Sequence, residues 1–148
     1  MQNNLRNFLS ARKKQKFAIE TGVQKHSKMQ RIVIDDDTEQ GAPELINKIK
    51  SNPTLLPLFS RLAKTEVPIA GIVKGKFISR RLDRMLIQKQ TKEIIFLDYK
   101  TDINKNTFRE KYIFQMREYI QLLKNIYPDY SIKCFILWLH DFETEPIF

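Results

Sequence analysis

The segment that ends in Asp98-Tyr99-Lys100 holds the residue types best suited to chemistry in this sequence. The apolar residues 94–97 before it predict a half-buried to fully buried strand, and the charged triplet predicts where that strand ends. Because side chains alternate between the two faces of a strand, Asp98 and Lys100 are expected on one face and Tyr99 on the other. An acid and a base would then stand together at the edge of a sheet, with the backbone carbonyl of Tyr99 between them.

Three further side chains are candidates for the same site. Asp83 lies in a predicted strand over residues 76–88, where alternation places it on one face with Arg81 and Met85. A salt bridge to Arg81 or Arg84 is the ordinary alternative for such a carboxylate. Gln115 and Tyr119 are four residues apart on a predicted helix, so they are neighbours beside its buried stripe.

The elements that would position these residues follow from the hydrophobic periodicity. Residues 66–73, 76–88 and 92–101 predict three strands in an antiparallel meander, with a turn at Gln90-Thr91. Residues 108–125 show the 3.6-residue period of a helix, which Tyr127-Pro128 ends. Residues 132–139 are rich in apolar β-formers and predict a central strand buried on both faces. We therefore expect one α/β domain, with a basic helical part over residues 1–62 and a catalytic core over residues 63–148.

The N-terminal residues 1–31, called here the basic arm, contain eight Lys or Arg residues and the single acid Glu20. They predict one or two helices with a strongly basic face, among whose residues are Arg12, Lys13 and Lys14. The arm is either a solvated helix or one that contacts phosphates. The acidic residues 35–39 lack the spacing of a calcium loop and are interpreted as the turn that starts a helix over residues 43–50. Residues 55–62 predict an apolar helical turn or two.

The composition of the chain limits the classes of function. With 148 residues, of which 42% are hydrophobic, the chain is long enough to bury one core. The net charge of +9 favours an anionic partner, nucleic acid above all, over ordinary basic surface charge. The one cysteine, Cys134, excludes an internal disulfide and an iron–sulfur cluster built by this chain, and it is interpreted as a buried apolar residue in a reducing compartment. Without a long apolar run or an apolar N-terminus, we expect a soluble cytoplasmic protein.

Several short motifs of this sequence occur in the order and spacing of a known family. They are Asn52-Pro53-(x)5-Phe59, Glu66-Val67-Pro68-Ile69-Ala70-Gly71, Leu82-Asp83-Arg84, Ile95-Phe96-Leu97-Asp98-Tyr99-Lys100-Thr101, Tyr112-(x)2-Gln115-Met116-(x)2-Tyr119, and Tyr127-Pro128 followed by Leu137-Trp138. Together they resemble the PD-(D/E)XK nuclease fold. More narrowly, the region from about Gly22 to Phe148 resembles the RecB-like nuclease domain at the C-terminus of AddA-type recombination helicase–nucleases.

This resemblance implies roles for individual residues. His26, which follows Gly22 at the position of the family's helix histidine, would be a metal ligand, together with Asp83, Asp98 and the Tyr99 carbonyl. One or two Mg²⁺ or Mn²⁺ ions would bind there, since hard cations prefer oxygen ligands. Lys100 would orient or deprotonate the attacking water and stabilise the charge of the transition state. Gln115 and Tyr119 would position Lys100 and the DNA strand, and Glu66 would have a supporting role.

The sequence also departs from the family pattern. Arg80 replaces the glycine usually found three residues before the strand aspartate, polar residues surround His26 where the family's helix is apolar, and Phe114 replaces an arginine that often precedes the glutamine. The sequence contains no Gly-(x)4-Gly-Lys-Ser/Thr motif, so we expect no ATP-driven motor in this chain. The chain would be a stand-alone nuclease or the separated end of a longer protein.

The sequence therefore predicts a metal-dependent deoxyribonuclease that acts in double-strand break repair beside separate helicase subunits of the AddAB kind. DNA would be held through its phosphates, without reading of sequence. The residues expected to contact it are Lys74, Lys76, Arg80, Arg81 and Arg84, together with Arg12, Lys13 and Lys14 of the basic arm. Two alternatives remain: a catalytically inactive module of the same fold that binds DNA or a repair partner, and a restriction-type or RNA-directed nuclease, against which the Gln115-(x)3-Tyr119 pair argues.

Overall fold

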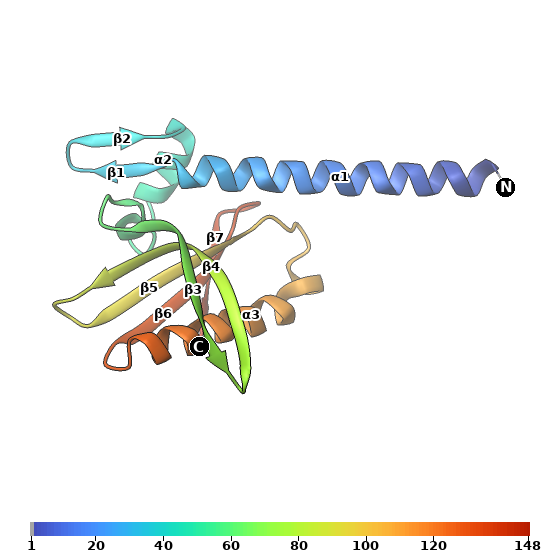
Figure 1. The fold of residues 1–148 in the computed structure, drawn as a ribbon. Coiled ribbons are helices and arrows are strands. Elements are labelled where there is room, and N and C mark those ends of the chain that lie inside the picture. Colours follow the sequence, from blue (N-terminus) through green and yellow to red (C-terminus); the bar gives the residue numbers. More distant parts are fainter. Residues whose placement is uncertain (1) are drawn as a thin grey trace.

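The computed structural model describes the backbone of residues 2–148 and the side chains of residues 4–14 and 22–148. The chain is a mixed α+β protein with a five-stranded sheet and a small two-stranded one (Figure 1). In chain order the elements are α1 (Gln2–Gln30), β1 (Val33–Asp35), β2 (Thr38–Gln40), α2 (Pro43–Lys50), the 3₁₀ helix η1 (Leu56–Phe59), β3 (Lys64–Val73), β4 (Lys76–Gln88), β5 (Glu93–Lys100), α3 (Lys105–Ile126), β6 (Ser131–Trp138) and β7 (Glu143–Ile147).

The large sheet has the strand order β3-β4-β5-β6-β7. Strands β3, β4 and β5 form the predicted antiparallel meander, and β6 pairs with β5 in parallel after the crossover through α3. A parallel pair needs such a crossover because a short hairpin can join only antiparallel strands. The predicted buried strand is thus confirmed as β6, whereas β7, which pairs antiparallel with β6, was not predicted.

Helices cover both faces of this sheet, so the core has two halves (Figure 1). On one face α3 packs its buried residues Met116, Tyr119, Leu122 and Leu123 against Phe96, Ile136 and Trp138. On the other face the end of α1, the β1–β2 hairpin, α2 and η1 pack against Leu97, Tyr99 and Leu137. Strands buried on both faces have nearly continuous apolar sequences, which is why β5 and β6 do. Cys134 lies in the first half of the core, 4% exposed, where burial raises the pKa of its thiol.

Two local expectations were wrong. The acidic residues 35–39 form the β1–β2 hairpin and its turn at Asp36-Asp37, not a turn that starts a helix. Aspartate suits tight turns because its side chain bonds to nearby backbone groups and tolerates unusual backbone angles. In β4, Leu82 and Met85 both face the α3 side, although they are three positions apart and strict alternation would place them on opposite faces. The strand therefore changes face at Asp83.

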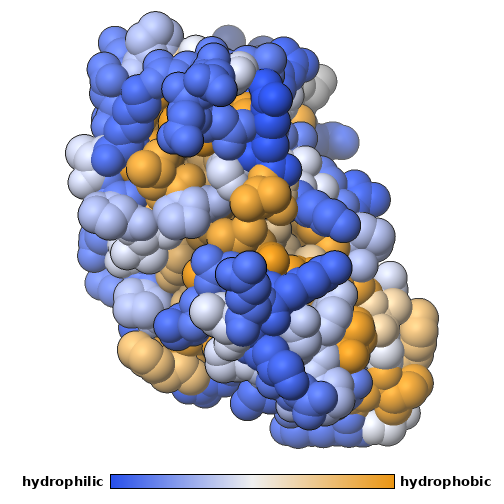
Figure 2. Space-filling model, turned by 90° about the vertical axis from the view of Figure 1, so that its left-hand side faces the viewer, coloured by the Kyte–Doolittle hydropathy of each residue, from blue (hydrophilic) through white to orange (hydrophobic). Residues whose placement is uncertain are grey.

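Helix α1 extends well beyond the rest of the fold, and its side chains at residues 4–14 are all exposed (Figure 1). The sequence predicted one or two helices in the basic arm, and the structure has a single continuous one, Gln2–Gln30. Seen from the side that carries the β1–β2 hairpin, the layer of α1, α2 and the hairpin is mostly hydrophilic, and hydrophobic residues surface in patches below it (Figure 2). Within residues 2–148 no helix is both long and apolar enough to cross a membrane.

Candidate functional site

The candidate site lies where strands β4 and β5 separate. Their ladder ends at the pair Arg84–Leu97, one residue before Asp83 would meet Asp98. Beyond that point the backbone N–H of Tyr99 donates to Asp83 Oδ2 over 2.7 Å instead of pairing with β4. A buried backbone donor must find a partner, and here a carboxylate supplies it. The separation therefore brings the carboxylates of Asp83 and Asp98, 9% and 6% exposed, to one opening in the sheet.

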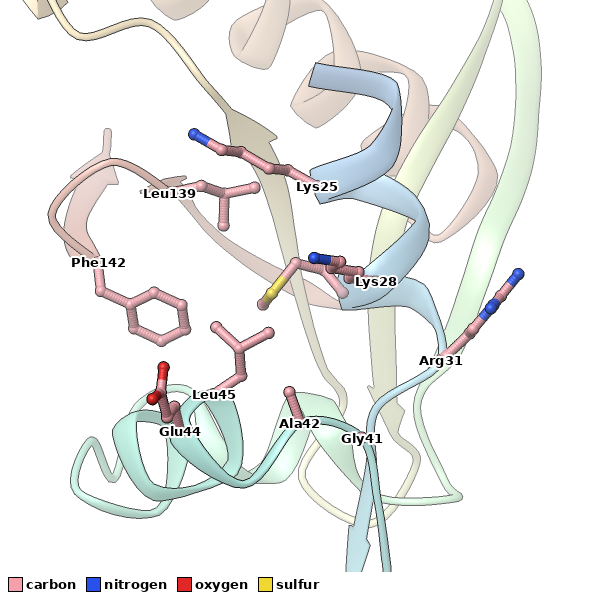
Figure 3. Close-up of a pocket in the computed structure, with 10 residues that line it drawn as sticks. Lys25, Lys28, Arg31, Gly41, Ala42, Glu44, Leu45, Leu139 and Phe142 are labelled. Carbon is pink, nitrogen blue, oxygen red and sulfur yellow. The ribbon is translucent and has the colours of Figure 1, made fainter. Parts of the chain in front are cut away.

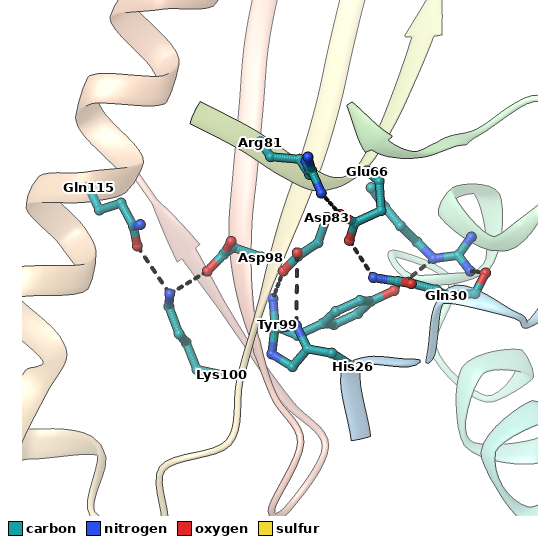
Figure 4. Close-up of polar contacts among 10 residues, drawn as sticks. His26, Gln30, Glu66, Arg81, Asp83, Asp98, Tyr99, Lys100 and Gln115 are labelled. Atoms are coloured by element: carbon teal, nitrogen blue, oxygen red, sulfur yellow. Dashed lines mark hydrogen bonds and ion pairs between the residues drawn. The ribbon is translucent and has the colours of Figure 1, made fainter. Parts of the chain in front are cut away.

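Lys100 lies on the same face as Asp98, as strand alternation predicted. Its Nζ lies 2.7 Å from Asp98 Oδ2 and donates to Gln115 Oε1 over 3.0 Å (Figure 4). The contact with Asp98 is an ion pair without hydrogen-bond geometry, so Asp98 Oδ2 accepts no hydrogen bond from any residue that the structure describes. Nζ also lies 4.1 Å from the centre of the Tyr112 ring, a cation–π contact that was not predicted. We call Asp83, Asp98 and Lys100 the acid–lysine cluster.

The electrostatics of the cluster are those of two acids held close together out of water. Burial raises the pKa of Asp83 well above its usual value, and the negative charge of Asp98 raises it further. The hydrogen bond from the Tyr99 N–H acts in the opposite direction, because it stabilises the charged carboxylate. The cluster has more negative charge than Lys100 alone balances when both acids are ionised, so it favours a cation.

Helix α1 brings His26 to this cluster from the other layer. Its Nδ1 lies 3.9 Å from Asp83 Oδ1, and its ring meets the Tyr99 ring edge-on at 5.5 Å. Gly22, one turn earlier, lets the helix pass close to the end of β5, since a Cβ on it would lie 3.3 Å from Thr101 Oγ1. Burial lowers the pKa of His26, and the negative charge of Asp98 opposes this. The polar neighbours of His26 therefore do not keep it from Asp83.

Arg84 is buried away from solvent, so the expectation that it meets a DNA phosphate was wrong. It is 2% exposed, and its guanidinium donates to the carbonyls of Met29, Ile32 and Leu58 and to the Tyr99 hydroxyl. The Phe59 ring lies 4.0 Å from its central carbon. Carbonyls at the end of a helix lack partners within the helix and attract positive charge. Arg84 therefore fastens the end of α1 to the sheet, and with it the turn that carries His26.

Glu66 borders the site on β3, as expected of a supporting residue. It accepts a hydrogen bond from Gln30, which follows His26 by four residues on α1, and it pairs with Arg81 over 3.1 Å (Figure 4). Its φ of 52° is one that residues other than glycine rarely adopt, and it lies opposite the position where β4 changes face. Gln30 was not predicted, although its spacing from His26 on one helix face could have indicated it.

The remaining predicted residues are less close to the cluster. Tyr119 is 3% exposed and packs in the core, with its ring 6.2 Å from that of Phe96, so it offers no surface to a DNA strand. Arg80 is exposed and pairs with Glu118 over 3.6 Å. Lys74 and Lys76 lie at the tip of the β3–β4 hairpin, and Lys76 is seven residues, roughly 23 Å of extended strand, from Asp83. Arg12, Lys13 and Lys14 are exposed on the projecting part of α1.

The donor atoms at the cluster fit a hard divalent cation in kind. Two buried carboxylates, of which Asp98 Oδ2 accepts no hydrogen bond, lie beside an imidazole whose lowered pKa keeps it in the neutral form that binds metals. As the side chains stand, no three His, Cys, Asp or Glu residues among those described converge into a ready metal centre. A cation would have to draw Asp83, Asp98 and His26 closer together than they are now.

No family model matches this sequence, and no curated protein is significantly similar to it.

Proposed function

We propose that this protein is a metal-dependent deoxyribonuclease of the PD-(D/E)XK superfamily, of the RecB-like kind found in AddA-type helicase–nucleases. One observation carries the proposal: Asp83 from β4 and Asp98 and Lys100 from β5 meet where these strands separate, with His26 of α1 3.9 Å from Asp83. A PD-(D/E)XK core is built on a mixed sheet with helices on both faces, and the five-stranded sheet of this protein is of that general class. The narrower assignment to this superfamily comes from the sequence motifs.

The residues of the cluster divide the work of phosphodiester hydrolysis between them. Asp83, Asp98, the Tyr99 carbonyl and His26 would hold Mg²⁺ or Mn²⁺, which when bound supplies water activation and charge neutralisation at the phosphate. Lys100, held by Gln115 and the Tyr112 ring, has its ammonium fixed where it can donate to a developing negative charge. Arg84 and Glu66 keep α1 and β3 in place around these groups. Phosphates would be bound by the exposed cations of the surface, without reading of sequence.

The wider setting of the proposal follows from the resemblance. The protein would act in recombinational double-strand break repair, in the cytoplasm, with helicase subunits supplied by other chains.

The test is DNA cleavage by the purified chain with Mg²⁺ or Mn²⁺ on linear duplex and single-stranded DNA. We expect cleavage by the wild type and a loss of at least about a hundredfold in Asp98→Asn and in Lys100→Gln, since each removes an interaction made in the transition state. Asp129→Asn makes the same chemical change in the exposed loop before β6 and should leave cleavage unchanged. Circular dichroism shows whether each variant is folded.

The catalytically inactive module is the second candidate, and it has one observation in its favour. Lys100 already pairs with Asp98 Oδ2 at 2.7 Å, so the oxygen that a cation needs is engaged by an ammonium. A folded wild type that binds DNA and cleaves none with either metal would decide for this module and against the nuclease.

A further inference from the structure

Asp102 lies two positions after Lys100, in the loop from β5 to α3, outside the acid–lysine cluster. Its Oδ2 accepts a hydrogen bond of 2.6 Å from the Tyr112 hydroxyl. A hydrogen bond to a carboxylate is shorter and roughly twice as strong as one between neutral groups. The carboxylate therefore fixes one end of the Tyr112 side chain to the loop that follows the proposed catalytic strand.

The ring of the same tyrosine contacts the Lys100 ammonium, whose Nζ lies 4.1 Å from the ring centre. A phenol that donates to a carboxylate becomes richer in electrons, so the face of its ring attracts a cation more strongly. Burial and the hydrogen bond to Asp102 raise the pKa of Tyr112, so the phenol keeps the proton that it donates. Asp102 therefore acts on Lys100 through the ring, which it both fixes and polarises.

The surroundings of the Tyr112 ring leave its hydroxyl to Asp102. The rings of Phe108 and Trp138 each lie 6.1 Å from the Tyr112 ring and pack beside it. Neither ring accepts a hydrogen bond from the hydroxyl, and among the residues that the structure describes Asp102 is its one hydrogen-bond partner. Packing alone therefore places the ring near Lys100, and the bond to Asp102 fixes how the ring is turned toward the ammonium.

The backbone of Lys100 is held separately from its side chain, because the Leu139 N–H donates to its carbonyl over 2.8 Å. The Leu139 side chain lines a cavity of about 440 Å³ between the end of α1, the start of α2 and the β6–β7 loop (Figure 3). Met29 and Phe142 line the same cavity, and both belong to the half of the core on the α1 face of the sheet. The Lys100 side chain turns the other way, so the ammonium is held from the α3 face.

We propose that Asp102 and Tyr112 are positioning residues of the proposed hydrolysis, in which the carboxylate holds the phenol and the phenol ring holds the Lys100 ammonium. We call these two residues the Asp102–Tyr112 tether. The proposal rests on the proposed function, since it takes Lys100 as the group that stabilises the developing charge. A lysine side chain has many rotamers, and a small displacement of a catalytic group costs rate. Weakening the tether should therefore lower kcat and leave the KM for DNA unchanged.

The first measurement requires neither metal nor cleavage. The ring current of an aromatic side chain shifts a proton above its face upfield, so the ε-CH₂ resonance of Lys100 reports its position over Tyr112. The resonance is observed in ¹H–¹³C spectra of the lysine-labelled protein in EDTA and is identified by its absence from Lys100→Gln. Tyr112→Leu, which removes the ring, gives the unshifted position. We expect an upfield shift in the wild type that is smaller in Asp102→Ala and in Tyr112→Phe. Asp102→Asn should restore it, because its amide oxygen still accepts the phenol proton.

The second measurement is the steady-state rate of DNA cleavage. Asp102→Ala and Tyr112→Phe delete the same hydrogen bond from its two ends, so each should lower kcat about three- to tenfold, the size of one hydrogen bond. The double variant should lose no more than either single variant, because the bond can be lost only once. The matched controls Asp129→Ala and Tyr130→Phe make the same chemical changes just before β6, at the opposite end of the β5–β6 pair from Lys100, and should leave kcat unchanged.

A Lys100 resonance that is unshifted in the wild type, or equally shifted in Asp102→Ala, would overturn the tether, as would losses of kcat that add in the double variant. If Asp102→Ala fails to fold, Tyr112→Phe decides, since it deletes the same bond and keeps the ring. A wild type that cleaves nothing, with a Lys100 shift that depends on Asp102, would refute the nuclease and retain the tether. Cleavage with wild-type kcat in both single variants would do the reverse.

Discussion

At the scale of single residues, the buried pair of acids Asp83 and Asp98 determines how the site responds to pH. The pKa of Asp83 is raised by burial and by Asp98, so the folded protein binds a proton more tightly there than the unfolded chain does. Stability from this group is therefore fully present below its ordinary pKa of about 4 and is lost as the pH rises through the raised value. A cation bound at the cluster would stabilise the ionised form of Asp83 and so offset this loss of stability.

Asp83→Asn should accordingly stabilise the metal-free protein, and by more as the pH rises from about 4 to neutrality. The amide keeps an oxygen that can accept the Tyr99 N–H, so the local fold is preserved. The measurement is the free energy of unfolding of both proteins in EDTA across this pH range. The contributions of the other titrating groups, which the two proteins share, cancel in the difference between them. Added Mg²⁺ or Mn²⁺ should raise the melting temperature of the wild type only. A pH-independent difference would contradict the assignment.

Which residues of the site could be predicted depended on how far away their partners lie. Asp98 and Lys100 are two apart on one strand, so alternation alone placed them on one face. Arg84 could not be assigned in this way, because it bonds to carbonyls of residues 26 to 55 positions away, and a basic residue in a strand is ordinarily interpreted as surface charge. The change of face at Asp83 could not be predicted from the sequence of β4 either, because it accompanies a positive φ at Glu66 on the neighbouring strand β3.

At the scale of elements, the strand meander, α2 and α3 were predictable because each has a strong period and clear end signals. The missed strand β7 has the sequence Glu143-Thr144-Glu145-Pro146-Ile147, charged and with a proline, which an edge strand tolerates because one side of its backbone needs no partner. The β1–β2 hairpin has only three residues in each strand, too few to show alternation.

The attachment of α1 to the sheet gives a prediction at this scale. Arg84→Met should destabilise the fold by roughly 3 kcal/mol, because several buried carbonyls and the Tyr99 hydroxyl lose their donor at once. Arg81→Gln, three residues away on the same strand, should cost less than about 1 kcal/mol, since its pair with Glu66 is exposed. Urea unfolding of both variants measures the contrast. Equal costs would mean that the guanidinium of Arg84 does not hold α1.

At the scale of the whole molecule, the layers divide two tasks. The sheet, α3 and the end of α1 build the site, while α1 projects from the fold at its start, where the side chains of residues 4–14 are exposed. A helix that packs against nothing adds little to stability, so its cations are free to serve another purpose. The net charge of +9 arises in good part from the basic arm, and long-range attraction of a polyanion is the purpose that such a charge serves best.

The triple variant Arg12→Gln/Lys13→Gln/Lys14→Gln tests whether the projecting helix contacts DNA. Unfolding in urea should be unchanged, because these side chains are exposed on the part of α1 that projects from the fold. Duplex affinity should fall, and the slope of log K against log salt should decrease by up to about 2.7, at about 0.9 for each phosphate that the three cations neutralise. Lys89→Gln/Lys124→Gln, which removes two exposed charges from the β4–β5 turn and from α3, serves as the control for a general loss of charge. If the triple variant keeps the wild-type slope, the arm is only a solvated helix, and the phosphates are bound around the acid–lysine cluster instead.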